Sequence, residues 1–166
     1  DRKDQPRVAL GAKLIANLIE AAGADKVLGM DFHTHQIQGF FDVPVDHLYA
    51  APVLTHYFRS LELDHPVVVA PDVGAAKMAR GFARRMNASF AIIDKRRPTQ
   101  IVAEVMEVIG DVVDRPCIIV DDMIDTAGTL VSVVDALKDR GAAEIYAAAT
   151  HAILSGPARD RLSASA

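Results

Sequence analysis

The sequence predicts an α/β fold, with a mostly parallel sheet flanked by helices. Two observations lead to this prediction. Short apolar runs alternate along the chain with segments whose apolar residues recur at helical spacing. The runs are apolar throughout instead of alternating with polar residues, which is typical of strands that helices bury on both faces. Parallel neighbours need such crossover helices between them, so the alternation favours a parallel sheet.

Five apolar runs are expected to form the strands. They are, in order, residues 26–30, 66–70, 90–93, 117–120 and 145–149. The helical segments alternate with them. These segments are the stretch with Leu14, Ile15, Leu18 and Ile19 on one face, then 53–61, 75–86, 129–138, and a last helix that starts near Ser155-Gly156-Pro157. Gly23, Asn87 and Gly141 follow three of these segments and can end them, because such residues tolerate a left-handed backbone.

Composition excludes several classes of protein. The chain has 166 residues, with 18 Lys and Arg against 22 Asp and Glu, so its formal net charge is −4. A general nucleic-acid binder usually carries a basic excess. Hydrophobic residues make up 51%, which excludes global disorder. No apolar run approaches the roughly 18 residues of a membrane-spanning helix, and no secretory signal is visible.

The single cysteine, Cys117, lies in an apolar run. We interpret it as an inert buried thiol in a reducing compartment. A catalytic nucleophile is the less favoured reading, because no histidine lies near it in sequence.

Polar side chains follow every predicted strand. In parallel α/β sheets, ligands bind where the strands end. One such residue is usually a helix cap or a turn residue, but five polar strand ends on one edge favour a shared site. These polar ends are Asp31 with His33, Asp72, Asp94 to Arg97, Asp121 with Asp122, and Thr150 with His151.

The most informative segment runs from the strand at 117–120 into the helix at 129. Asp121 and Asp122 come first, and a small loop with Thr126, Gly128 and Thr129 follows. Amides at a helix start together with two hydroxyls make an anion site, and glycine allows close approach of the backbone. An acidic pair beside an anion site suits a ligand with phosphate at one end and a diol or bound cation at the other, as in a sugar phosphate. The alternative, a helix cap beside a surface carboxylate pair, does not explain both acids.

This segment resembles the phosphoribosyl pyrophosphate loop of phosphoribosyltransferase-like proteins, and further segments resemble ribose-phosphate pyrophosphokinases. These are Met30–His33 with Gln36–Asp42, Val69–Gly74, Ile92–Pro98, and Thr150–His151 with Leu154–Pro157. Asp1-Arg2-Lys3 looks like the end of that family's ATP-contacting loop. The resemblance implies a phosphoribosyltransferase-like fold. It also implies transfer of the terminal diphosphate of Mg-ATP to the anomeric hydroxyl of ribose 5-phosphate, with release of AMP.

The resemblance also implies site residues. Asp125, Thr126, Ala127, Gly128 and Thr129 would hold the 5-phosphate, and Asp121 with Asp122 would hold the ribose hydroxyls and their magnesium. His33 and Asp72 match positions that serve Mg²⁺ with ATP. For His33, a hydrogen bond to phosphate or to metal-bound water is an equal alternative, since magnesium prefers oxygen ligands.

The stretch 95–100 is the least regular part of the sequence and is expected to be a mobile loop. By the resemblance, Lys95 would be a catalytic cation, and Arg97 would act in catalysis and also face the sugar phosphate. Taken alone, this basic run would more often be a solvated turn. His35 has no assigned role and is read as a surface histidine.

The sequence departs from the family's pattern at three positions. Ala9 stands where a proline is expected, Ala75 replaces a second glycine, and His47 stands where the family usually has asparagine. Gln38, Asp46 and the asparagine position contribute to the family's regulatory site, so the departure at His47 puts allostery in doubt.

The resemblance also predicts organisation and context. Family chains are about twice as long, and this one starts at Asp1, so we expect a piece of a longer protein. Residues 1–50 would be a remnant of an N-terminal phosphoribosyltransferase-like domain, and 51–166 most of the C-terminal one. The family is cytoplasmic and forms homo-oligomers, namely hexamers, with ATP and ribose 5-phosphate as partners and no nucleic acid or membrane.

Two other functions compete with this one. A phosphoribosyltransferase that consumes the product would share Asp121 to Thr129, but not His33 or the Lys95 to Pro98 segment. A regulatory homologue or an RNA-binding relative would not be an enzyme. The former should have lost Lys95, which is present, and the latter should carry a basic face, which a net charge of −4 disfavours.

Overall fold

The structure is a computed structural model that describes residues 10–96 and 105–165, with only the backbone of residues 95, 96 and 105. The chain divides into two compact units, and the boundary lies between Ala50 and Ala51. Arg97 and the segment Asp1-Arg2-Lys3, both singled out from the sequence, lie outside the described residues, as does Ala9.

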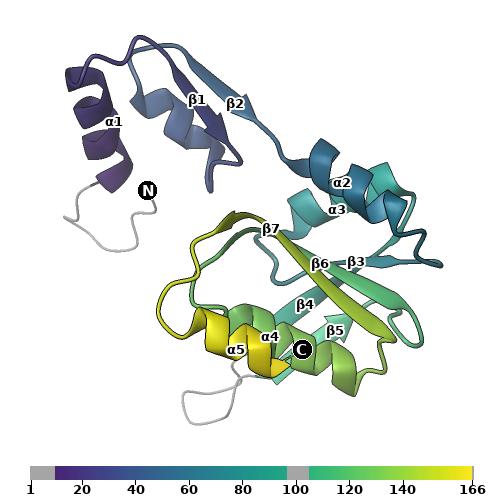
Figure 1. Cartoon of the computed structure of the whole chain (residues 1–166). Helices are drawn as coiled ribbons and strands as arrows, with labels where there is room; N and C mark the ends of the chain where they lie inside the picture. Colours follow the sequence, from purple (N-terminus) through teal and green to yellow (C-terminus); the bar gives the residue numbers. More distant parts are fainter. Residues whose placement is uncertain (1–9, 97–104, 166) are drawn as a thin grey trace. The chain divides into compact units, whose positions relative to one another are not determined.

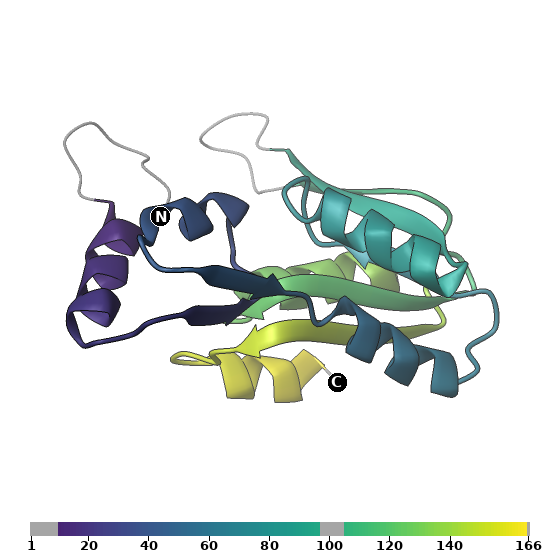
Figure 2. The ribbon, with the colours of Figure 1, turned by 90° about the horizontal axis from the view of Figure 1, so that it is seen from above.

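The first unit is built around two short parallel strands, which Figure 2 shows side by side. Its elements are α1 (Gly11–Ala21), β1 (Val27–Met30), the 3₁₀ helix η1 (His35–Phe40) and β2 (Val45–Leu48). The predicted helix and first strand are confirmed, whereas η1 and β2 were not predicted. The apolar face of α1 is exposed within this unit, where Leu14 is 58% and Leu18 56% accessible, and only Ala16 is buried.

The second unit contains a five-stranded sheet in the order β5-β4-β3-β6-β7. All neighbours are parallel except β4 and β5, which are antiparallel. Its elements are α2 (Ala51–Ser60), β3 (Val67–Ala70), α3 (Ala76–Met86), β4 (Ser89–Arg96), β5 (Val105–Ile109), β6 (Pro116–Ile124), α4 (Gly128–Asp139), β7 (Glu144–Ala152) and α5 (Ala158–Ser165). The predicted fold class is therefore confirmed.

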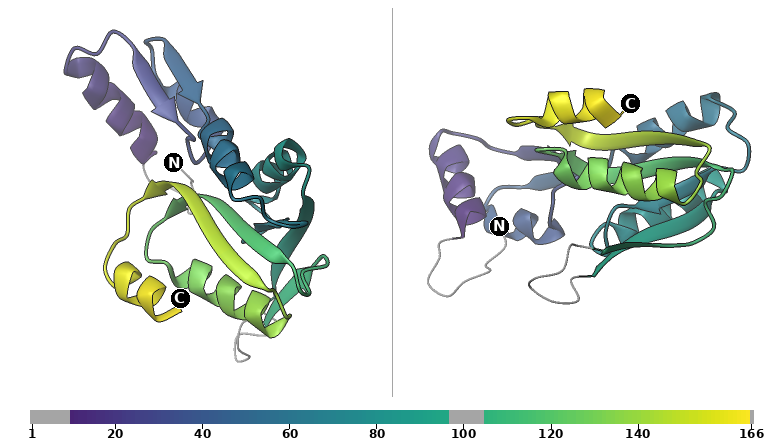
Figure 3. Two further views of the ribbon diagram at one scale, coloured as in Figure 1. Left: turned by 45° about the vertical axis from the view of Figure 1, so that its right-hand side comes forward. Right: turned by 90° about the horizontal axis from the view of Figure 1, so that it is seen from below.

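Helices cover both faces of this sheet, as Figures 1 and 3 show. Alternate residues of the central strands enter two separate clusters, because successive side chains of a strand point to opposite faces. Val69 and Ile119 pack with Leu137 of α4, whereas Val68 and Ile118 pack with Phe82 of α3. Strands buried on both faces need apolar residues at every position, which explains the continuous apolar runs of the sequence.

Three strands are longer than the apolar runs that predicted them. β4, β6 and β7 continue past their apolar parts, so polar residues expected after these strands lie inside them. Asp94, Lys95 and Arg96 lie inside β4, the first residues of the expected loop among them, Asp121 and Asp122 inside β6, and Thr150 and His151 inside β7. The reason is pairing beyond the apolar runs: β4 pairs with β5 as far as Arg96 opposite Val105, and β6 pairs with β7 as far as Ile124 opposite Ala152. β5 was not predicted.

Cys117 is fully buried in the centre of the sheet. Burial raises the pKa of its thiol to about 11. A thiol with so high a pKa stays protonated near neutral pH and is a poor nucleophile. The predicted burial of Cys117 is confirmed, and its inertness stays a prediction.

Candidate active site

The loop between β6 and α4 lines a hollow of about 190 Å³ in the second unit. The hollow brings together most of the site residues predicted for this unit: Asp72, Asp121, Asp125, Thr126, Ala127, Gly128 and Thr129 line it, with Pro71, Ile119, Met123, Ile124, Leu130, Ala147 and Ala148. Asp122 is next to Asp121 but is not among the lining residues. Residues from the ends of β3 and β6 thus meet at the carboxyl edge of the sheet, as expected for an α/β fold.

The loop turns into α4 through a left-handed residue. Ala127 has φ +59°, and α4 begins at the next residue, Gly128. Among the described residues, the N–H groups of 126–130 meet no hydrogen-bond acceptor; the first such bond in the helix is Val131 N–H to the carbonyl of Ala127. Successive N–H groups left unpaired at a helix start, with the partial positive charge of the helix dipole, favour an anion.

Gly128 is not required by the packing of the protein itself. A Cβ at this position would meet Arg161 Nη1 at 3.4 Å and Thr126 Oγ1 at 3.9 Å, which are ordinary contacts. Its backbone is helical, so it is Ala127 that adopts the unusual conformation. Neither packing nor backbone conformation thus requires glycine at position 128. That glycine allows a ligand to approach the backbone closely here stays a prediction.

Three carboxylates, those of Asp72, Asp121 and Asp122, lie close to this loop. Asp72 follows β3, and its Oδ1 accepts a hydrogen bond from the backbone N–H of Ala75 at 3.0 Å, just before α3. Asp121 Oδ1 accepts the N–H of Asp122 at 2.9 Å. Asp72 therefore stabilises the turn before α3, a role expected of a lone acid after a strand, and it also lines the hollow.

The pKa of Asp121 is raised to about 7. Burial is the largest cause, and a hydrogen bond with the Asp122 side chain and the negative charges of Asp122 and Asp72 act in the same direction. Ionising Asp121 is thus unfavourable in the protein alone. A bound cation or a set of hydroxyl donors would relieve this cost, so the acidic side of the hollow suits such ligands.

The regulatory residues proposed from the sequence lie in the first unit. Gln38 Nε2 is 3.3 Å from His47 Nδ1, whereas Asp46 forms an ion pair with Lys26 at 2.5 Å. Asp46 and His47 are neighbours in β2 and therefore point to opposite faces. The structure therefore brings Gln38 and His47 together and places Asp46 on the opposite face of β2.

His35, which had no predicted role, lies against His47, with 3.4 Å between their Nδ1 atoms. The Nε2 atom of His47 accepts the backbone N–H of Phe32 at 3.1 Å. Burial lowers the pKa of His47, and the charge of His35 lowers it further. The neutral form of His47 is therefore favoured, and nothing in the sequence beyond its departure from the family pattern indicated this.

The remaining predicted residues are placed only in part. His33 is an exposed residue of the first unit, and Lys95 lies near the end of β4, where only its backbone is described. Within residues 10–96 and 105–165, no group of three or more His, Cys, Asp or Glu side chains could hold a metal ion. No helix in the same ranges is long and apolar enough to cross a membrane.

Comparison with known proteins identifies the family. Residues 51–164 match the model of the phosphoribosyl transferase domain, which is more than half of the chain. The chain belongs to the phosphoribosyl transferase domain family. The same residues contain the whole hollow and the loop that lines it.

The more similar relatives carry one name. Ribose-phosphate pyrophosphokinases from Chlorobaculum tepidum and Caldanaerobacter subterraneus are 55% and 58% identical over 99% and 98% of this chain. The phosphoribosylpyrophosphate synthetase of Mycobacterium smegmatis superposes with a TM-score of 0.88 at 42% identity over 98% of this chain and 53% of that chain. The predicted resemblance is confirmed. The chain spans about half the length of the curated relatives it matches, 51% for the first and 52% for the second.

More distant structures share the fold. The purine phosphoribosyltransferase of Pyrococcus horikoshii has a TM-score of 0.55 at 22% identity and covers 80% of this chain. Likeness at this level shows a common fold and carries no statement about substrate.

One residue near the loop was missed by the sequence analysis. Arg161 of α5 donates a hydrogen bond from Nη1 to the carbonyl of Thr126 at 2.9 Å. An arginine in a short polar helix 35 residues further along the chain gives no sequence signal for this contact.

Proposed function

We propose that this chain carries the ribose 5-phosphate site of a ribose-phosphate pyrophosphokinase. The reaction transfers the terminal diphosphate of Mg-ATP to the anomeric hydroxyl of ribose 5-phosphate, giving phosphoribosyl pyrophosphate and AMP. The observation that carries the proposal is the hollow in which unpaired loop amides lie beside carboxylates. The names of relatives more than 50% identical support the reaction.

The loop supplies the phosphate end of the proposed site. The amides of residues 126–130 and the hydroxyls of Thr126 and Thr129 are donors, and a phosphate monoester presents acceptor oxygens only. Asp121 and Asp122 supply the sugar end, because carboxylates accept hydrogen bonds from the ribose hydroxyls. The two halves discriminate a sugar phosphate both from free sugar and from inorganic phosphate.

Magnesium fits the acidic side of the hollow. Asp72 and Asp121 offer oxygen ligands. Burial first, and the charges of Asp122 and Asp72 in addition, raise the pKa of Asp121, and a bound cation would offset the cost of ionising it. Because Mg²⁺ keeps several waters, a site with one or two protein carboxylates is sufficient. Asp72 would serve the ion that accompanies ATP, and we propose that His33 serves it too, either as a ligand or through a hydrogen bond to phosphate or to metal-bound water. The bound ion would neutralise charge on the phosphate oxygens.

In the proposed reaction, the anomeric oxygen attacks the β-phosphorus of ATP. The bond from that phosphorus to the oxygen of the α-phosphate breaks, AMP leaves with that oxygen, and the hydroxyl proton is lost. Negative charge develops on the non-bridging oxygens during this transfer, so catalysis consists mainly of positioning and charge neutralisation. Lys95 and Arg97 are proposed to supply cations for this charge, and Arg97 also to contact the sugar phosphate.

The setting proposed for this site follows the family. Residues 1–50 would belong to an N-terminal phosphoribosyltransferase-like domain and 51–166 to the C-terminal one. We further propose a cytoplasmic homo-oligomer, and a regulatory role for Gln38, Asp46 and His47.

A chimera provides the test. The 166 residues would replace the matching half of the Chlorobaculum tepidum relative, to which they are 55% identical. We expect AMP and phosphoribosyl pyrophosphate to form from ATP and ribose 5-phosphate, as monitored by ³¹P NMR. A folded chimera that makes neither product, or that only consumes phosphoribosyl pyrophosphate in the presence of a nucleobase, would contradict the proposal.

A further inference from the structure

The carbonyl oxygens at the start of the phosphate loop are bound by one other segment. The Ile124 carbonyl accepts the N–H groups of Ile153 and Leu154, at 3.0 and 3.1 Å, and the Asp125 carbonyl accepts that of Ser155 at 3.0 Å. The next carbonyl, that of Thr126, accepts Arg161 Nη1 at 2.9 Å. Residues 153–161 are not among the residues that line the hollow, so the groups that bind these three carbonyls come from outside its lining.

This arrangement matters because a carbonyl that faced the hollow would repel an anion. In a loop, a rotation of one peptide plane exchanges the direction of its N–H and its C=O. Fixing a carbonyl on the far side therefore fixes the following N–H toward the ligand. The Thr126 carbonyl belongs to the same peptide group as the Ala127 N–H, and Arg161 alone holds it among the described residues.

The backbone of residues 153–155 is itself strained in a way that supports this role. Leu154 has φ +53°, the left-handed region, which a residue with a side chain adopts at a cost of about 1–2 kcal/mol. With this left-handed conformation at Leu154, three successive N–H groups, those of Ile153, Leu154 and Ser155, donate hydrogen bonds to the carbonyls of the loop. Strain of this kind persists where the surrounding contacts over-determine the backbone.

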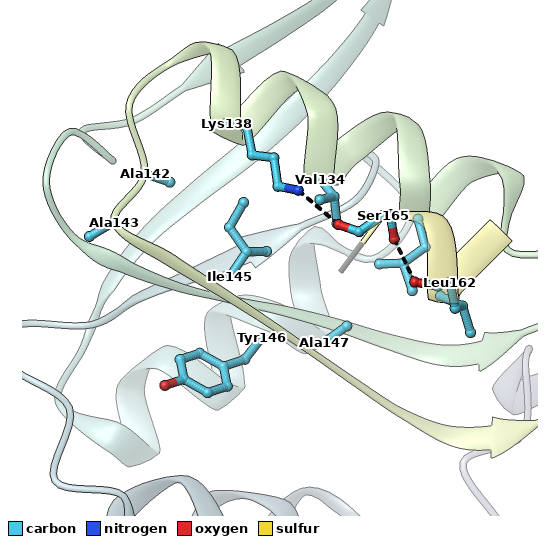
Figure 4. A pocket seen from close by; sticks show the side chains of 10 residues that line it. Val134, Lys138, Ala142, Ala143, Ile145, Tyr146, Ala147, Leu162 and Ser165 are labelled. Carbon is cyan, nitrogen blue, oxygen red and sulfur yellow. Dashed lines mark hydrogen bonds between the residues drawn. The ribbon is translucent and has the colours of Figure 1, made fainter.

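Arg161 is presented from a helix that is firmly docked. Ala158 is fully buried, and Leu162 packs against the core cluster beside α4. Figure 4 shows Leu162 and Ser165 lining a pocket that Val134 and Lys138 of α4 also line, and Lys138 Nζ donates a hydrogen bond to the Ser165 carbonyl at 2.8 Å. The guanidinium also lies near the loop, since Nη1 is 3.4 Å from the position that a Cβ of residue 128 would occupy.

We propose that Arg161 is a positioning residue for the phosphate of the substrate. It holds the Thr126 carbonyl outward, so that the Ala127 N–H is available to the anion. This inference rests on the proposed function of the loop, and it adds a residue from α5 to a site otherwise formed at β3, β6 and the start of α4.

The test compares Arg161→Met, Arg161→Lys and the matched control Arg159→Met. Arg159 is an exposed arginine of the same helix, and no contact of its side chain is seen in the described structure. Ribose 5-phosphate and inorganic phosphate would each be titrated into the 166-residue protein, with binding followed by NMR. Thermal unfolding without ligand would be recorded for every variant.

We expect Arg161→Met and Arg161→Lys both to bind ribose 5-phosphate about tenfold more weakly, the size of one charge-assisted hydrogen bond at an exposed position. Lysine keeps the charge but lacks the planar fork that reaches the carbonyl. Inorganic phosphate should weaken by the same factor, because the lesion lies at the phosphate end. Arg159→Met should bind as the wild type does.

Three results would overturn the inference: wild-type affinity in Arg161→Met, wild-type affinity in Arg161→Lys, or an equal loss in Arg159→Met. A larger loss for ribose 5-phosphate than for inorganic phosphate would also overturn it, because general destabilisation would affect the sugar contacts too. Wild-type protein that binds phosphate but not ribose 5-phosphate would instead contradict the proposed function and leave the test of Arg161 valid.

Discussion

Replacing Asp121 by asparagine is expected to stabilise the protein at about pH 8 and to have a small effect at about pH 4.5. In the folded protein the pKa of Asp121 is raised from 3.8 to about 7. The unfolded chain therefore loses this proton first as the pH rises, and stability falls between these two pH values. The destabilisation is absent below about pH 3.8 and complete above about pH 7. Asparagine keeps the shape and the acceptor for the Asp122 N–H but has no charge to bury.

The expected magnitude follows from the same pKa values. About 1.4 kcal/mol for each pH unit between 3.8 and about 7 gives an upper limit of about 4 kcal/mol. Asp121 is only half-buried, so water screens part of this energy. We therefore expect Asp121→Asn to raise the free energy of unfolding by about 1–2 kcal/mol at pH 8, and by about a quarter of that at pH 4.5.

Urea unfolding at both pH values measures this difference, with Asp135→Asn, an exposed residue of α4, as the control. The control should show no comparable gain. A gain for Asp121→Asn that is equal at both pH values, or a loss of stability at pH 8, would refute the reasoning. The first would mean that the effect is not one of charge, and the second that ionised Asp121 stabilises the fold.

Three further predictions concern the loop, the basic segment and the cysteine. Gly128→Val should abolish ribose 5-phosphate binding in calorimetry with little change in the unfolding temperature, since a Cβ at 128 meets only ordinary contacts; unchanged binding would refute the assignment of the loop. In the active chimera, Lys95→Ala and Arg97→Ala should each lower kcat by roughly a hundredfold or more while KM for ATP changes far less, because a cation aimed at developing charge acts in the transition state; a large rise in KM with kcat intact would show a binding role instead. Cys117 should react with iodoacetamide at neutral pH only on unfolding, given its burial and its pKa of about 11; rapid labelling of the folded protein would contradict the structure.

Much of the fold could be predicted because the central strands carry one strong signal. Strands such as β3 are buried on both faces, so their residues are apolar without interruption. β5 lacks that signal, since Glu107 and Ile109 are exposed and only Val108 is well buried, and its place depends on antiparallel pairing with β4. β2 in the first unit lacks it too, with alternate residues exposed.

The site was predictable where its residues are close in sequence. Residues 121–129 form one continuous segment, and Asp72 joins it because strands β3 and β6 are neighbours. Contacts between polar residues that are far apart in the sequence could not be predicted, because no sequence pattern indicates them. Arg161 meets the loop only through the docking of α5, and His35 meets His47 only through the placement of η1 beside β2.

Titration of the ¹⁵N-labelled protein with ribose 5-phosphate tests the central claim most directly. With Mg²⁺ present, ribose 5-phosphate should shift the amide resonances of residues 126–130 in a saturable manner, and ribose at the same concentration should not. Saturable shifts confined to residues outside this loop, or equal shifts with ribose, would contradict the claim that the loop holds the phosphate of a sugar phosphate.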